Sequence, residues 1–119
     1  MKFLIVDDNE NVRLLLRDYL SALADEVYEC ADGCEALSFF KRYHPDWVLM
    51  DWRMPNTDGI SATREILDMF PKANICMVTA FDDEEIRSEA TAAGARGFVL
   101  KDNLFELDAI LQKKKPPKR

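Results

Sequence analysis

Short apolar runs alternate with longer amphipathic segments along this chain, and the alternation predicts strands and helices in turn. The apolar runs occupy residues 2–6, 27–30, 46–50, 74–78 and 97–100. A run of this length, bounded by polar residues, is typical of a buried strand. The run at 27–30 alternates more than the others, which places it nearer the edge of a sheet.

The segments between these runs carry apolar residues at helical spacing. In the first, one apolar face is predicted from Val12, Leu15, Leu16, Tyr19, Leu20 and Leu23. Asp32 begins the next helix, with Glu35 three residues on as in a capping box, and Pro45 marks its end. Three more helices are predicted over 59–70, over 83–93 with Gly94 as its C-cap, and over 103–113 with Leu104, Leu107, Ile110 and Leu111 buried.

Five βα units in succession predict an α/β fold. Its strands form a doubly wound parallel sheet, its crossovers are right-handed and its helices cover both faces. The 119 residues, 48% hydrophobic and 32% charged, suit one soluble domain. We expect this domain over 1–112, followed by a basic, proline-containing tail or linker stub over 113–119. Apolar runs this short predict no membrane span or signal peptide, so a cytoplasmic location is expected.

Charge is unevenly distributed along the chain. The net charge is −6, yet residues 113–119 hold five of the 16 basic residues and no acidic one. The rest of the chain is therefore strongly acidic and is expected to repel nucleic acid. Cys30 and Cys76 lie in apolar runs, and with Cys34 they form no CxxC pair. They are interpreted as reduced, mainly buried side chains.

Charged residues follow three of the predicted strands where each strand ends. Asp7 and Asp8 follow the first, Asp51 the third and Lys101 the fifth. The carboxyl ends of parallel strands meet at one edge of the sheet, where ligands bind in open α/β folds. Three carboxylates there would repel one another unless a cation lay among them. Mg²⁺ takes carboxylates, waters and phosphate oxygens as ligands and would relieve that repulsion.

Asp51 is the candidate nucleophile, because a carboxylate can attack phosphorus and form an aspartyl phosphate. Lys101 would supply a positive charge to a phosphoryl oxygen, and Thr79, at the end of the fourth strand, a hydroxyl donor. Taken singly, each of these two residues is more often structural or solvated. Their coincidence with three aspartates at one edge favours a phosphoryl site.

These motifs, in this order, resemble the receiver domain of two-component response regulators over residues 2 to about 112. The resemblance rests on Asp7-Asp8, Asp51 with Met54-Pro55 and Asp58-Gly59, Thr79-Ala80, and Gly97-Phe98-Val99-Leu100-Lys101. It implies a flavodoxin-like (βα)5 fold with strand order 2-1-3-4-5. It also implies a phosphorelay signalling domain whose own chemistry is limited to gaining and losing a phosphoryl group.

The resemblance further implies roles for individual residues. Asp51 would accept the phosphoryl group from a histidine kinase, a histidine phosphotransfer protein or a small phosphodonor. The Mg²⁺ ligands would be Asp8, Asp51 and the backbone carbonyl of Arg53, with Asp7 helping through water. Thr79 and Lys101 would bind the phosphoryl oxygens, and Phe98 would change rotamer when Thr79 moves.

This movement would alter an output surface formed by the fourth helix, the fifth strand and the fifth helix. The output partner is not predicted, and a phosphorylation-dependent homodimer is left open. Direct nucleic-acid binding is not expected without an output domain.

Two positions depart from or add to this pattern. Asp102 follows Lys101 where many receivers have proline, and a non-proline cis bond is costly, so a trans bond is predicted. Arg53, two residues after Asp51, places a guanidinium near the site. We hypothesise that it changes the lifetime of the phosphoryl group by obstructing or orienting the attacking water.

Three other functions are weighed against this one. A flavin-binding protein would share the fold, but the acidic residues after the first strand would repel its phosphate. A phosphatase of the haloacid dehalogenase type would use Asp51 as nucleophile, but Arg53 breaks its DxD pattern. A phosphorylation-independent interaction module would need neither the acidic set nor Lys101.

Overall fold

A parallel sheet of five strands in the order β2-β1-β3-β4-β5 forms the centre of the computed structural model, which describes residues 1–113. This confirms the predicted flavodoxin-like fold, and the strand boundaries agree to within one residue at either end. The strands are β1 Lys2–Val6, β2 Glu26–Cys30, β3 Trp47–Met50, β4 Ile75–Thr79 and β5 Gly97–Leu100.

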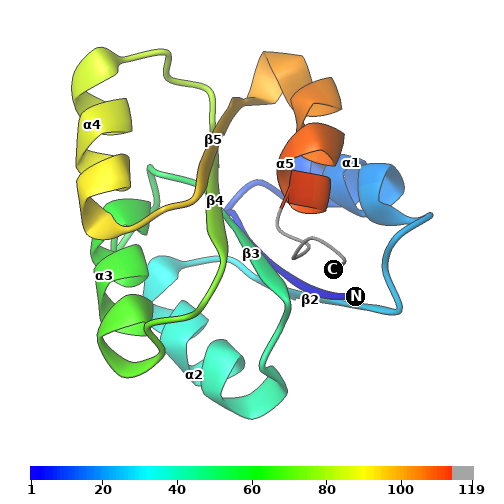
Figure 1. Cartoon of the computed structure of the whole chain (residues 1–119), viewed down its shortest axis with the longest axis horizontal. Helices are drawn as coiled ribbons and strands as arrows, with labels where there is room; N and C mark the ends of the chain where they lie inside the picture. The colour runs from blue at the N-terminus through cyan, green and yellow to red at the C-terminus, as the bar shows by residue number, and fades with distance from the viewer. Residues whose placement is uncertain (114–119) are drawn as a thin grey trace, which may run out of the picture.

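The helices form one layer on each face of the sheet (Figure 1). On one face lie α1 (Glu10–Leu20) and α5 (Leu107–Lys113), and on the other α2 (Gly33–Tyr43), α3 (Gly59–Met69) and α4 (Glu84–Ala93). Each of α1 to α4 is preceded by an Asn or Asp N-cap, whose side chain accepts a hydrogen bond from a backbone amide of the first helical turn. Such caps satisfy amide groups that have no partner within the helix.

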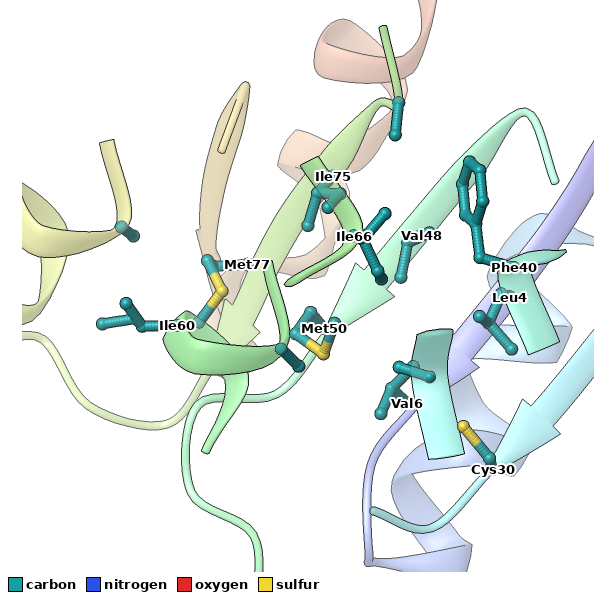
Figure 2. Packing of buried hydrophobic residues seen from close by; sticks show 14 of the residues in the cluster. Leu4, Val6, Cys30, Phe40, Val48, Met50, Ile60, Ile66, Ile75 and Met77 are labelled. Atoms are coloured by element: carbon teal, nitrogen blue, oxygen red, sulfur yellow. The ribbon is translucent and has the colours of Figure 1, made fainter. Parts of the chain in front are cut away.

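The core is divided by the sheet into two apolar clusters. Figure 2 shows the cluster that α2, α3 and α4 cover, to which the strands contribute Met50 and Met77 and helix α3 contributes Ile60 and Ile66. The cluster under α1 and α5 contains Trp47 and Leu16. Strands β3 and β4 are buried along their whole length because helices cover both faces, as their continuous apolar runs predict.

The apolar face of α1 is narrower than predicted. Leu16 and Leu20 are buried, but Leu15 and Tyr19 are 48% and 47% exposed. On the other flank of the helix, Arg13 and Arg17 form ion pairs with Glu29 of β2, at 2.8 and 2.7 Å. The apolar face predicted for α1 is therefore wider than the part of the helix that packs on the sheet. Leu15 and Tyr19, on one side of this face, remain exposed to solvent.

The last predicted helix is also different. The sequence predicts one helix over 103–113, but the structure has two elements there. A 3-10 helix, η1 (Lys101–Glu106), contains a non-helical residue at Asn103, and α5 follows it. A 3-10 turn brings residues three apart onto the same side. It buries Leu104 and Leu107 directly after β5. Ile110 is only partly buried, contrary to prediction. The Lys101–Asp102 bond is trans, as predicted.

Two other predictions concern the chain's end and membrane insertion. The predicted tail begins at Lys113, which still belongs to α5, and residues 114–119 lie outside the described part of the structure. Within residues 1–113, every helix is too short or too polar to cross a bilayer.

Candidate functional site

The register of the sheet brings the predicted acidic residues together at its carboxyl edge. Val6 of β1 pairs with Met50 of β3, so the residues that follow them, Asp7 and Asp51, are neighbours. The amide of Asp51 also donates to the carbonyl of Val6 at 2.9 Å, which holds the two chain segments together just past the strand pair. Two positions that are far apart in the sequence therefore share one site.

Three carboxylates converge there. Asp7, Asp8 and Asp51 each offer an oxygen, and these oxygens lie within 4.8 Å of one another. Asp7 and Asp51 are 1% and 5% exposed, whereas Asp8 lies on the surface. A hard divalent cation matches this donor set, because all three groups are oxygen ligands that carry negative charge.

Lys101 supplies positive charge to the two buried carboxylates. Its Nζ lies 3.0 Å from Asp7 Oδ2 and 3.4 Å from Asp51 Oδ1. Asp7 Oδ2 is buried and, among the described residues, has no hydrogen-bond donor of good geometry, so the lysine contact acts mainly through charge. Among the described residues, the Lys101 ammonium contacts two of the three clustered carboxylates, which leaves the site negative and suited to a further cation.

The pKa values reflect this imbalance. Burial and the nearby Asp7 carboxylate raise the pKa of Asp51 from 3.8 to about 6, although Lys101 acts in the opposite direction. Burial disfavours the charge of Lys101, but its contacts with Asp7 and Asp51 outweigh this and raise its pKa. The lysine therefore stays charged, and Asp51 holds its proton more tightly than an exposed aspartate does.

Thr79 and Phe98 lie beside this cluster on the next strands. Thr79 ends β4 and is fully buried, and its Oγ1 accepts a hydrogen bond from the amide of Phe81 at 3.2 Å. Phe98 lies in β5 and is half-buried. The guanidinium of Arg87, on α4, covers its ring at 4.3 Å from the centroid, a cation–π contact that the sequence did not reveal.

Arg53 is exposed, as expected for a loop residue, but its guanidinium is not free in solvent. It lies over the ring of Phe81 at 5.6 Å. Trp52 meets the same ring edge-on at 5.2 Å between centroids. Sequence reasoning missed Phe81, although its place two residues after Thr79 puts it in the loop that follows a site strand.

Sequence reasoning also took Asp32 for a helix cap alone. Its carboxylate accepts from the amide of Cys34 in α2, and also from Asn56 and Thr57 in the loop between β3 and α3. That loop follows Asp51 directly and contains Arg53. The available clue is that Asp32 comes just after β2, as Asp7 comes after β1 and Asp51 after β3.

This geometry agrees with the comparison to known proteins. A family model described as "Response regulator receiver domain" matches residues 3–113. The chain belongs to this family. It is a receiver domain, and this match supports neither the flavin-binding nor the phosphatase alternative.

Relatives of this receiver domain occur alone and within longer proteins. It is 43% identical over 98 residues to the chemotaxis protein CheY of Halobacterium salinarum, with 82% of each chain covered. It is 41% identical to the uncharacterized transcriptional regulatory protein YhcZ of Bacillus subtilis, where 86% of this chain spans 49% of the relative.

A solved structure shares the fold. The CheX–CheY–BeF3–Mg²⁺ complex from Borrelia burgdorferi superposes with a TM-score of 0.85 at 26% identity, covering 95% of this chain and 87% of that one.

The raised pKa of Asp51 predicts that Asp51→Asn stabilises the metal-free receiver domain. Between pH about 4 and 6 the folded protein keeps a proton on Asp51 that the unfolded chain has lost, so wild-type stability falls as pH rises through this window. The variant should be more stable by about 1–3 kcal/mol at pH 7.5, and the gap should close near pH 4.

Urea unfolding in EDTA measures this difference, with Asp18→Asn, an exposed site on α1, as control. A gap that is the same at both pH values would contradict the prediction.

Proposed function

We propose that this receiver domain is the phosphoacceptor switch of a two-component system and that Asp51 is the residue phosphorylated. One observation carries the proposal: Asp51 is 5% exposed, yet its carboxylate lies among Asp7, Asp8 and the ammonium of Lys101. This arrangement destabilises the negative charge of Asp51 when no cation is bound. It suits a carboxylate that interacts with a bound cation and accepts a phosphoryl group. The donor would be a histidine kinase or a histidine phosphotransfer protein.

The residues at the site fit Mg²⁺. Asp8 and Asp51 would ligate it directly, with Asp7 through water and the Arg53 backbone carbonyl as a further ligand. The negative charge that the Lys101 contacts leave unbalanced on these carboxylates supports this assignment. When bound, the ion would neutralise charge on the phosphoryl oxygens and on the carboxylates.

The chain's own residues then perform the transfer. An oxygen of ionised Asp51 attacks the phosphorus of the donor, the bond from phosphorus to the donor nitrogen breaks, and that nitrogen leaves with the bonding electrons. Lys101, already 3.4 Å from Asp51, holds one phosphoryl oxygen. Thr79 holds another through its hydroxyl.

The structure suggests how this event could reach the surface. For Thr79 to donate to the phosphoryl group, its Oγ1 must turn from the amide of Phe81. Space vacated by Thr79 would let Phe98 turn inward, out from under Arg87. Shifting a population from 1:99 to 99:1 takes about 5.5 kcal/mol. Two or three charge-assisted hydrogen bonds, at about 1.5–3 kcal/mol each, sum to about 3–9 kcal/mol, a range that includes this figure.

The output surface would comprise α4, β5 and α5, the elements around Phe98. No output partner is assigned to this surface, and a phosphorylation-dependent homodimer stays an open alternative. The similar structure from Borrelia burgdorferi is a complex of CheX, CheY, BeF3 and Mg²⁺, which supports a binding role for the domain. The domain over 1–112 would act in the cytoplasm, either alone or with a further segment after its basic tail.

Treatment with acetyl phosphate and Mg²⁺ should add one phosphoryl group to Asp51, because the site combines a nucleophile with the charges that stabilise transfer. Intact-mass and peptide mass spectrometry would detect and locate it, with Asp51→Asn as control. Beryllofluoride, which stands in for the phosphoryl group, should change the fluorescence of Trp52 in wild type alone. Modification elsewhere, or none, would favour the phosphorylation-independent module.

Arg53→Asn should shorten the half-life of the phosphorylated domain by about two- to fivefold. This factor corresponds to the free energy of one exposed cation–π contact. The guanidinium of Arg53 lies over the Phe81 ring, and in this proposal the contact keeps it where it obstructs the attacking water. Phe81→Leu should have the same effect, and the double variant should add little.

Loss of label after removal of the donor measures these half-lives, with Arg64→Asn on the exposed surface of α3 as control. Equal half-lives for wild type and Arg53→Asn would refute the role of Arg53.

Arg87→Met should tighten beryllofluoride binding by about two- to fivefold, because it removes the cation that holds Phe98 outward and thereby favours the inward state. Arg96→Met, at an exposed position just before β5, is the matched control and should bind as wild type does. Fluorescence titration in saturating Mg²⁺ gives the affinities. A variant with unchanged affinity would show that the Arg87 contact does not restrain the switch.

A further inference from the structure

Asp32 lies outside the carboxylate cluster, in the turn between β2 and α2. It is 7% exposed and serves as the N-cap of α2, because its Oδ1 accepts from the amide of Cys34 at 3.1 Å. An Asp at this position needs no further explanation when it bonds only to its own helix. Asp83, the cap of α4, does this and accepts from Glu85 and Ile86.

Asp32 differs because most of its hydrogen bonds come from another part of the chain. Its Oδ2 accepts from both the amide and the side-chain Nδ2 of Asn56, at 2.9 and 3.0 Å. Its Oδ1 accepts from the amide of Thr57 at 3.1 Å. One carboxylate thus joins the β2–α2 turn to the loop between β3 and α3.

The ionised form of Asp32 is strongly favoured. Burial opposes its charge, but the amides of Cys34, Asn56 and Thr57 outweigh this and lower its pKa to about 2. The bonds to the loop are therefore charge-assisted at any physiological pH, and such bonds are stronger than those between neutral groups.

Packing brings the turn and the loop into direct contact as well. A Cβ at Gly33 would lie 2.5 Å from the carbonyl oxygen of Thr57, so only glycine permits this approach. The loop's other end is held by a hydrogen bond from the amide of Gly59 to the carbonyl of Trp52 at 2.8 Å. Arg53 lies between these two attachment points.

We propose that Asp32 is a positioning residue for the metal site, which it serves by fixing the loop whose Arg53 carbonyl would ligate Mg²⁺. This inference rests on the proposed function. Mg²⁺ demands near-octahedral ligand geometry, so a loop that drifts costs affinity even when every ligand is present. Loss of groups that orient metal ligands typically weakens binding about 10–100-fold.

Asp32→Ser separates the two roles of this residue. Serine caps a helix about as well as aspartate, but its shorter side chain cannot reach Asn56 and Thr57. Calorimetric titration of the full chain with Mg²⁺ should give a Kd raised about tenfold. Asp83→Ser changes a cap with no link to the loop and should leave the Kd within about twofold of wild type. Hydrogen exchange at the Asn56 and Thr57 amides should quicken in Asp32→Ser alone.

The outcomes distinguish this inference from the function on which it rests. A wild type that binds no Mg²⁺ would overturn both. Wild-type binding with an unchanged Kd in Asp32→Ser, or with the same loss in both serine variants, would overturn only the positioning role. Should Asp32→Ser fail to fold, Asn56→Ala removes one donor and keeps the cap. It should raise the Kd about threefold, and an unchanged value would refute the inference.

Discussion

The repulsion between buried carboxylates at the ends of β1 and β3 is the constraint on which this structure depends. Asp7 and Asp51 are both nearly inaccessible to water, and within residues 1–113 the ammonium that contacts them, that of Lys101, comes from the end of β5. Three strands must therefore end at the same level for the charges to be tolerated together. The residual negative charge of this site favours a bound cation. Such a cation would in turn favour the ionised form of Asp51, so cation binding and the ionisation of Asp51 are coupled.

Around this centre, loop residues are held by a small number of polar and cation–π contacts. Asp32 ties down the loop after Asp51, Phe81 holds Arg53 and Trp52, and Arg87 covers Phe98. The cation–π contacts at Phe81 and Phe98 are worth about 0.5–1 kcal/mol each, whereas the charge-assisted hydrogen bonds of Asp32 are stronger. Under the proposed function, the elements held by the weaker contacts would change state when a charged group arrives, while the sheet and the loop tied by Asp32 would stay in place.

The fold was predictable because each strand and most helices carry their own local pattern. Continuous apolar runs of four or five residues between polar residues are typical of strands covered on both faces, and caps such as Asp83 and Gly94 lie where a helix begins and ends. The two errors have one cause. The exposure of Leu15 and the 3-10 turn before Leu107 depend on how much surface the sheet and neighbouring ion pairs leave for a helix, and a sequence pattern carries no information on that area.

The sequence alone determined which residues end the strands, since a charge after an apolar run marks its exit from the core. That sufficed to select Asp7, Asp8, Asp51, Thr79 and Lys101 as a single cluster. Only the tertiary structure decided which of these carboxylates are buried and which side chains outside the motifs support them. Asp32 and Asn56, or Arg87 and Phe98, are joined by contacts between separate elements. Such contacts depend on packing distances of a few ångströms, and these are set only when the helices lie on the sheet.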